Sequence, residues 1–425
     1  MSKKYFFLLM AAYLMAACSS GKEETVQQES VQQLTDADFI SYRPMVTNGT
    51  TRSVPTTSAN FREFFVKVTA GSPAPSPGAF SAFNQTVTSP DGTTWFAYDE
   101  NGARRMWPED GTLVFEAKAP LTLNDNFEVA QYPKDQVDAM LAYETGSKAV
   151  NSATGVPLYF RHILSQVTIR ACNLNTNDYE VKVLGAKLVN VKSKGTLTHP
   201  TASTGSGFSW DSYNPWGDTP NTLASYMNKA GGVATATSTA SEAITLDGSS
   251  VDITFGQGPM FIIPQQLTAA DLSDVGTSGS YIAVLLRIAT KTTIAAANGN
   301  PEFPIGTVLY PRQKDDTTSP NYTTAQFGFV AVPINTQFKP GFKYTFNLNF
   351  FGPNGGGCGL VDPNPVNPDL ATDPDVDTHP GKAEPVGGPL PDLNPGEEIV
   401  KAPHPIYFTV TVDDWLDTAA GDMNL

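Results

Sequence analysis

Residues that could carry out chemistry are few and are poorly spaced for catalysis. The chain has only 3 cysteines and 4 histidines. It contains no His-Glu-x-x-His helix, no paired Cys-x-x-Cys and no Gly-x-Ser-x-Gly turn, which are the patterns of zinc sites and serine hydrolases. His162 falls in an expected strand, where a packed or surface side chain is the simpler interpretation, and His199, His379 and His404 each adjoin a proline. We therefore predict no catalytic residues, no metal, no cofactor and no enzymatic activity.

Two groups of residues leave alternatives open. The acids Asp362, Asp369, Asp373, Asp375 and Asp377 could offer oxygen ligands to calcium, but their spacing differs from that of a calcium-binding loop, and a solvated acidic loop is favoured. Cys172 and Cys358 could form a disulfide in an oxidising compartment, or stay as free thiols. The glycine run 355–359 follows a strand, but no helix follows it, so we interpret it as a turn rather than a phosphate site.

The N-terminus reads as an export signal that ends in a cysteine. Lys3 and Lys4 precede an apolar stretch, residues 5–17, which is too short to span a bilayer comfortably. Small residues then precede Cys18, a pattern that resembles a bacterial lipobox, in which the signal is cut before a cysteine that receives lipid. An ordinary signal peptide with an incidental cysteine is the alternative. The polar, partly acidic residues after Cys18 resemble the tether that sends some lipoproteins to the outer face of the outer membrane.

Composition limits the class of protein. The chain has 425 residues, 27 basic and 42 acidic side chains, and a net charge of −15. This balance argues against a protein that follows nucleic-acid phosphates. Glycine and proline number 35 and 33, which predicts many turns. An exported, acidic, turn-rich β protein fits these values.

Hydrophobic periodicity predicts strands along most of the chain. Residues 113–119 and 342–350 alternate apolar and polar, as half-buried strands do. Asn101-Gly102 lies between two β-rich runs and predicts a hairpin. Residues 134–144 are one of few helix candidates, because apolar side chains recur there at three- and four-residue spacing. Further strands are expected at 39–46, 61–69, 156–172, 180–191, 251–263, 281–289, 328–334, 341–351 (which includes the alternating residues 342–350) and 406–412.

Residues 352–405 differ from the rest. They carry twelve prolines, and residues 360–400 hold nine acids against one lysine. Proline lacks the N–H that a central strand needs, so this segment is expected to be a long surface loop. Earlier in the chain, Trp210, Tyr213 and Trp216 cluster among turn residues, where they fill the end of a core or, alternatively, stack on sugars.

These features together resemble the fimbrillin superfamily, the pilins of Gram-negative anaerobes that are exported as surface lipoproteins. The resemblance covers most of the chain in order. It is carried by the lipobox, Thr51-Arg52 ahead of a strand, residues 95–98, 106–120, 158–167 and 340–346, and the closing strand that ends at Trp415.

The resemblance implies a fold and a domain organisation. The fold is all-β, with two tandem transthyretin-like antiparallel β-sandwich domains and few short helices. The domains are a lipoprotein signal (1–18), a tether and N-terminal strand removed on maturation (19–52), an N-terminal sandwich (53–160) and a C-terminal sandwich (161–425). Within the last, 352–405 is the Pro/Asp-rich loop and 406–412 the terminal donor strand.

The resemblance also implies a structural fimbrial subunit that supports cell adhesion. An Arg-specific maturation protease would cut after Arg52, with Arg43, Arg62, Arg104 and Arg105 as competing sites. The strand around Ile40, Tyr42 and Val46 would then leave its groove, releasing the lipid on Cys18 as well. The location would change from cell outer membrane to fimbrium.

The expected partners are other fimbrial subunits, joined head to tail when a strand is donated to a neighbour. The donor is expected at the C-terminus, where the side chains of one apolar row are Ile406, Phe408, Val410 and Val412. The alternative is a lipid-anchored adhesin or glycan-binding protein that does not polymerise. A surface hydrolase using acids of 360–400 is a weaker hypothesis, because such a loop gives paired carboxylates no rigid support.

Overall fold

The computed structural model describes residues 34–46, 60–210, 213–217, 223–229, 242–254, 258–312, 327–352, 357–363, 393–401 and 407–414. Cys18, Arg52 and Ile406 lie outside the described residues. Residues 36–425 form one compact unit, and the elements below belong to it.

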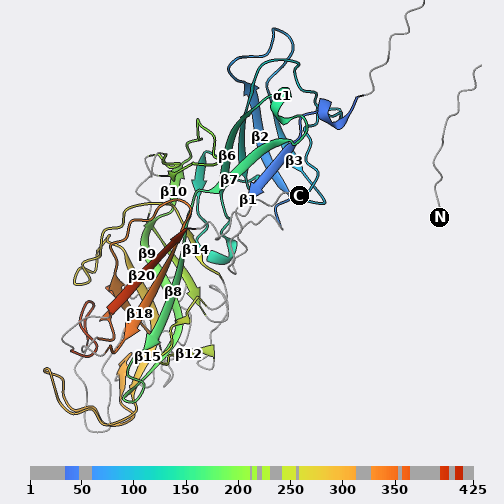
Figure 1. The fold of residues 1–425 in the computed structure, drawn as a ribbon. Coiled ribbons are helices and arrows are strands. Elements are labelled where there is room, and N and C mark those ends of the chain that lie inside the picture. Colours follow the sequence, from blue (N-terminus) through green and yellow to red (C-terminus); the bar gives the residue numbers. More distant parts are fainter. Residues whose placement is uncertain are drawn as a thin grey trace, which may run out of the picture. The chain divides into compact units, whose positions relative to one another are not determined.

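The chain is almost entirely β, as predicted (Figure 1). Its first sheet has six strands, in the spatial order β1 (Tyr42–Val46), β7 (Val156–His162), β6 (Met140–Gly146), β4 (Leu113–Ala119), β2 (Glu63–Ala70) and β3 (Phe83–Thr88). The helical elements of the described chain are η1 (Asp36–Asp38), η2 (Pro133–Asp135) and the four-residue α1 (Lys148–Asn151). No helix among the described residues is long and apolar enough to cross a lipid bilayer.

Two further large sheets come mainly from later residues. One has the order β11 (Leu223–Lys229), β9 (Tyr179–Lys192), β15 (Tyr281–Thr290), β17 (Gly328–Pro333) and β19 (Leu360–Val361), with β12 (Ile244–Thr245) beside β9 and β16 (Val308–Tyr310) beside β15. The other has the order β13 (Val251–Asp252), β8 (Ser165–Asn173), β18 (Phe342–Phe350) and β20 (Tyr407–Asp414), with β14 (Met260–Ile262) beside β8. A small ladder joins β5 (Asn126–Glu128) to β10 (Lys194–Thr196).

Buried side chains form three clusters. One cluster covers the six-stranded sheet and includes Phe64, Phe115 and Phe160. The largest includes side chains of both later sheets, for example Val284 and Phe346, as the core of a β-sandwich does. The third contains Tyr281 and Phe329, which belong to β15 and β17 of the seven-stranded sheet.

The strands predicted from strict alternation of apolar and polar residues are confirmed. In β4 and in most of β18, every second residue is buried and those between are half-buried. The Asn101-Gly102 hairpin is also confirmed, because Tyr98 bridges Arg104 and Asp99 pairs with Ala103. Most strand pairs are antiparallel, as expected, but β1 with β7 and β8 with β18 run parallel.

The helix expected over 134–144 is wrong. Only η2 is helical there, and Met140–Gly146 is strand β6, which pairs with β4 and β7. Met140 and Leu141 are both fully buried, but they belong to different core clusters. Consecutive apolar residues are needed when both faces of a strand are covered, and in a short segment that pattern imitates a helical stripe.

The surface loop expected over 352–405 is wrong at its two ends. Cys358, Val361 and Asp362 are buried, and Leu360–Val361 forms the edge strand β19. Ile399 and Val400 are buried in the largest cluster. The apolar residues at the ends of this segment therefore pack into the largest cluster, which we call the second core. Residues 364–392 lie outside the described part of the chain.

The region 156–172 was expected as one strand region, and it forms two strands in two different sheets. β7 ends at His162 in the first sheet, and β8 begins at Ser165 in the sheet that also holds β20. The division between 160 and 161 stays a proposal. Leu123, Phe127 and Leu141, which precede it, pack in the largest cluster.

Candidate functional site

The segment 36–46 packs into the core of the first sheet, although it is far in sequence from β7, the strand it pairs with. β1 lies beside β7 at the edge of that sheet (Figure 1). Ile40 is fully buried, and Tyr42 and Val46 are 4% and 9% exposed. The Tyr42 ring makes edge-to-face contacts with Phe64 and Phe115, with centroids 5.6 and 6.0 Å apart. β1 is therefore part of the core rather than a strand laid on the surface.

The backbone of this segment pairs with two different partners. The Ile40 N–H donates to the Arg105 carbonyl at 2.8 Å, and the Ile40 carbonyl accepts from Ala97 at 2.9 Å. From Tyr42 onward the register changes to a parallel ladder with β7, which runs from Tyr42 opposite Val156 to Val46 opposite Phe160. The segment thus connects the hairpin around Asn101-Gly102 to the six-stranded sheet.

Ion pairs and a cation–π contact add weaker interactions at the start of the segment. Lys148 lies 3.2 Å from Asp38 and 2.8 Å from Glu109. The Arg104 guanidinium pairs with Asp36 and lies over the Phe96 ring, 3.8 Å from its centroid. Exposed pairs of this kind contribute about 0–1 kcal/mol each. The apolar side chains therefore dominate the attachment of the segment.

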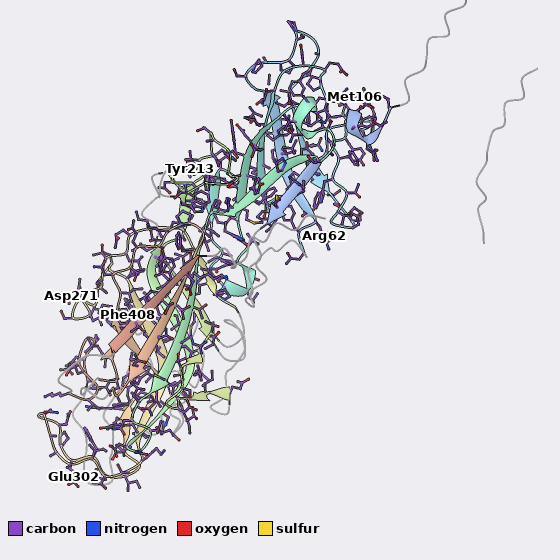
Figure 2. The ribbon with its side chains drawn as sticks, in the orientation of Figure 1. Arg62, Met106, Tyr213, Asp271, Glu302 and Phe408 are labelled. Carbon is purple, nitrogen blue, oxygen red and sulfur yellow. The ribbon has the colours of Figure 1, made fainter. Side chains whose placement is uncertain are left out.

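The closing strand β20 is attached differently. It pairs antiparallel with β18 over eight residues, from Tyr407 opposite Asn349 to Asp414 opposite Phe342. Phe408 (labelled in Figure 2) and Val410 are half-buried against the largest cluster, whereas Val412 is 50% exposed. β20 ends its sheet, so its outer edge has no neighbouring strand among the described residues. The expected donor role of this row stays a prediction.

The aromatic cluster at 208–216 packs inward at one end. Trp216 is 2% exposed and its indole N–H donates to the Ile163 carbonyl at 2.7 Å. Trp210 is half-buried and stacks on Tyr213, whose hydroxyl donates to the Thr198 carbonyl. The expectation that these rings fill the end of a core is confirmed for Trp216.

The two described cysteines are free thiols, so the possible disulfide does not form. Cys172 lies 3.0 Å from the Asn349 amide oxygen, and Cys358 is fully buried. Burial raises the pKa of both thiols, that of Cys358 to about 12. Thiolate is the reactive form, so the raised pKa lowers the reactivity of both side chains at neutral pH.

One acid that was expected in a solvated loop is instead buried. Asp362 is fully buried, 3.5 Å from the Lys187 ammonium, and it accepts a hydrogen bond of 2.9 Å from the Tyr281 hydroxyl. Asp369, Asp373, Asp375 and Asp377 lie outside the described residues. Within the described part of the chain, no group of three or more His, Cys, Asp or Glu side chains could hold a metal.

His162 is a packed histidine, as expected. Its Nδ1 lies 2.9 Å from the Asp138 carboxylate, and both side chains are buried. Sequence reasoning missed this pair and the Lys187–Asp362 pair. The one available signal for the latter was a lysine within the apolar run 183–191, which is otherwise typical of a buried strand.

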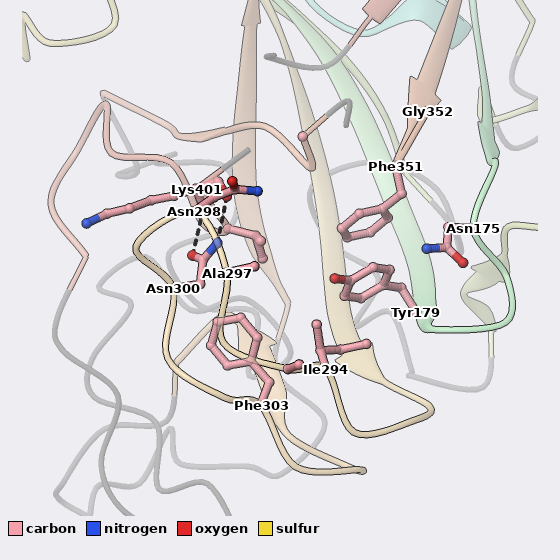
Figure 3. Close-up of a pocket in the computed structure, with 13 residues that line it drawn as sticks. Asn175, Tyr179, Ile294, Ala297, Asn298, Asn300, Phe303, Phe351, Gly352 and Lys401 are labelled. Atoms are coloured by element: carbon pink, nitrogen blue, oxygen red, sulfur yellow. Dashed lines mark hydrogen bonds between the residues drawn. The ribbon is translucent and has the colours of Figure 1, made fainter. Parts of the chain in front are cut away.

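A small pocket lies at the hairpin 294–303 (Figure 3). Asn298 and Gly299 both have positive φ at the turn of this hairpin, which suits a two-residue turn. Tyr179 and Phe351 stack on the other side, with ring centroids 3.9 Å apart. The Asn300 amide is already bonded to the backbone of Lys401 in both directions. The volume of about 190 Å³ is below the range of about 300–1,000 Å³ that is typical of ligand sites.

Comparison with known proteins gives one family match. A family model described as fimbrillin-like matches residues 51–356. None of the curated proteins matches the chain. Solved structures that match the chain include a fimbrial protein from Bacteroides vulgatus, at 18% identity and a TM-score of 0.42, covering 73% of this chain and 94% of that one. A candidate cell adhesion protein from Bacteroides ovatus has 14% identity and a TM-score of 0.38, covering 73% and 92%.

Proposed function

This chain belongs to the fimbrillin-like family, and we propose that it is a structural subunit of a surface fimbrium that supports cell adhesion. The detailed proposal has three parts: export as a lipoprotein anchored through Cys18, cleavage after Arg52, and polymerisation by donor-strand exchange. We propose that the subunit lies at the outer membrane before cleavage and in the fimbrium afterwards.

One observation carries the proposal. The core strand β1 ends at Val46, and Arg52 follows six residues later in a segment of small and polar residues. Cleavage there would leave the segment 36–46 held only by non-covalent contacts. Polar segments between strands are the places where proteases cut most readily.

Loss of β1 would leave a site that fits another strand. The parallel edge of β7 would have unpaired N–H and carbonyl groups, and Phe64 and Phe115 would lose the Tyr42 ring. An open sheet edge beside an apolar groove binds an extended peptide with apolar side chains at alternate positions. Burying each large apolar side chain there contributes about 1.5–3 kcal/mol, and ordering the incoming strand opposes that gain.

The C-terminal strand supplies a pattern of this kind. Phe408, Val410 and Val412 stand at alternate positions, and their side chains are less buried in β20 than those of Ile40 and Tyr42 are in the first sheet. Exchange would move β20 from a partly covered edge to a more enclosed groove. A contact between the end of one copy and the start of the next does not close, so it produces a filament.

Limited digestion with an Arg-specific protease tests this proposal. Wild type is expected to give a mature N-terminus at Ser53 and then filaments by electron microscopy. Arg52→Ala is expected to remain uncut there and to stay monomeric. Arg43→Ala is the matched control, because Arg43 is an exposed arginine on β1 itself, and it should behave as wild type. Filaments from the Arg52→Ala chain, or cleaved chains that stay monomeric, would contradict the proposal.

The alternative, a non-polymerising glycan-binding protein, has less support in the described residues. Trp216 is buried, Trp210 is packed against the core, and the pocket at 294–303 is small. Glycan binding that is lost in Trp210→Ala, in a chain that does not polymerise after cleavage, would favour this alternative.

A further inference from the structure

Lys187 occupies an unusual place on the central strand β9. Its side chain is 6% exposed, and its Nζ lies 4.2 Å from the centroid of the Phe329 ring. Ala186 and Leu188, its neighbours in sequence, belong to the sandwich core. The strand has a bulge at Leu184, since Val183 and Gly185 are paired with consecutive residues of β15. Lys187 therefore points away from the sandwich core, toward the cluster that contains Phe329.

The register leaves a path for the lysine across the sheet. Lys187 stands opposite Ala283 of β15, Ala283 opposite Ala331 of β17, and Ala331 opposite Leu360 of β19. Two alanines in this row leave room for a long side chain above the sheet. At the far end is Asp362, which directly follows β19 and whose N–H donates to the Phe329 carbonyl at 3.1 Å. The pair thus connects the strand next to β11 with the opposite edge of the sheet.

The contact between the two groups is longer than a good ion pair. Lys187 Nζ and Asp362 Oδ2 are 3.5 Å apart, whereas charge-assisted hydrogen bonds between such groups measure about 2.7–2.9 Å. Both side chains are almost completely buried, and two buried charges are costly unless their geometry is excellent. The Lys187 Nζ is nevertheless close enough to Oδ2 to place the amine beside the carboxyl group whose Cγ it would attack.

We propose that Lys187 and Asp362 condense to form an intramolecular isopeptide bond. The uncharged Lys187 amine attacks Cγ of the protonated Asp362 carboxyl, so a C–N bond forms. A C–O bond then breaks, and the carboxyl oxygen leaves with two protons as water. Overall, one ammonium and one carboxylate become one amide and one water, and no oxidant, reductant or cofactor is needed.

Tyr281 is placed to assist as a positioning and polarising residue. Its hydroxyl donates to Asp362 Oδ1 at 2.9 Å, which draws electron density from the carbon under attack and holds the carboxyl in place. Burial raises the pKa of Tyr281, so the hydroxyl keeps its proton and remains a donor. Transfer of one proton from the Lys187 ammonium to the Asp362 carboxylate gives the uncharged amine and acid that react.

The bond would fasten the short edge strand β19 to the middle of the seven-stranded sheet. β19 has only two residues and pairs only through Leu360 and Val361. A covalent connection to β9 would hold this edge under a pulling force along the chain. The inference concerns the cluster that contains Phe329 and Tyr281, and it does not depend on the proposed assembly.

Peptide mass spectrometry of the purified full-length chain, digested under denaturing conditions, tests the proposal. We expect one cross-linked species that contains both Lys187 and Asp362 and is lighter than the sum of its two peptides by one water. Trypsin should fail to cut after Lys187. Lys182 is a matched control, because it lies on the same strand 3.0 Å from the Glu180 carboxylate, but its side chain is 37% exposed rather than buried. It should stay uncoupled and be cut by trypsin.

Three variants sharpen the result. Lys187→Arg keeps the charge but is not expected to form the amide, so the cross-linked species should disappear. Asp362→Ala should have the same effect, and Tyr281→Phe should slow formation in a time course after refolding. Separate, unmodified Lys187 and Asp362 peptides from the wild-type chain would overturn the proposal, and this outcome does not depend on whether any variant folds.

Discussion

The first strand and the last strand of the described chain are held in opposite ways. β1 has five residues in a parallel ladder, but Ile40, Tyr42 and Val46 at and before it are almost completely buried. β20 has eight residues in an antiparallel ladder, but Phe408 and Val410 are only half-buried and Val412 is half exposed. The first strand is held mainly by side chains, and the last mainly by its backbone.

This difference predicts that the two strands detach from their sheets with different ease. Backbone hydrogen bonds make only a small net contribution to the free energy of holding a strand, because water replaces them when the strand opens. The stabilisation from apolar burial has no such replacement and is lost when a strand leaves the core. β20 is therefore expected to open more readily than β1. A strand that opens readily suits a donor, and a deep groove suits an acceptor.

The largest expected effect is at Tyr42. Tyr42→Ala removes a buried ring that contacts Phe64 and Phe115, and we expect the first sheet to lose about 3–5 kcal/mol of unfolding free energy. This loss of unfolding free energy is measured by urea denaturation, with hydrogen exchange of the β2 and β4 amides as the probe of the first sheet.

Tyr42→Phe is the control for that measurement. The Tyr42 hydroxyl is buried and has no hydrogen-bond partner among the described residues, so its removal should cost little or stabilise the protein. Equal losses for the alanine and phenylalanine variants would show that packing of the ring is not what holds β1.

Smaller effects are expected on β20. Phe408→Ala should lower the stability of the second core by about 1–2 kcal/mol, since only part of the ring is buried against residues such as Phe346. Val412→Ala should change it by less than about 0.5 kcal/mol. Denaturant midpoints of the two variants give the comparison, and a loss at Val412 as large as that at Tyr42 would break it.

Labelling of the two cysteines tests the same difference between the buried core and β20, and its expected effect is the smallest. Cys172 contacts Asn349, which pairs with β20, whereas Cys358 is enclosed and its pKa is raised to about 12. At pH 8 we expect iodoacetamide to label Cys172 first, and Phe408→Ala to speed that reaction selectively. The modified peptides identify the labelled residue. Faster labelling of Cys358 would mean that the second core opens before β20 does.

Much of this fold follows from alternation in the sequence. Residues 113–119 and 342–350 each have one buried face, so a period of two identifies them. Residues 134–144 defeat the same reasoning, because Met140 and Leu141 are buried on opposite sides of one strand. Parallel pairing of β1 with β7 depends on residues far apart in sequence, which no local pattern records.

The candidate sites divide in the same way. The apolar residues of 39–46 and 406–412 were visible as strands, and the structure adds which sheet each joins. The Lys187–Asp362 pair was not visible, since a bulge at Leu184 sets which face Lys187 occupies, and Asp362 lies in a segment expected to be solvated.

The central claim is that β1 leaves the first sheet after cleavage and that another strand takes its place. Hydrogen exchange of the amides that face β1 tests this claim most directly. The Val156 N–H donates to the Ser41 carbonyl at 2.9 Å, and that of Ala97 donates to the Ile40 carbonyl. Both amides should be protected in the uncut chain, exchange rapidly once the chain is cut after Arg52 and the N-terminal segment is removed, and regain protection in filaments. Amides that stay protected after removal, or filaments in which residues 36–46 are still bound, would contradict the account.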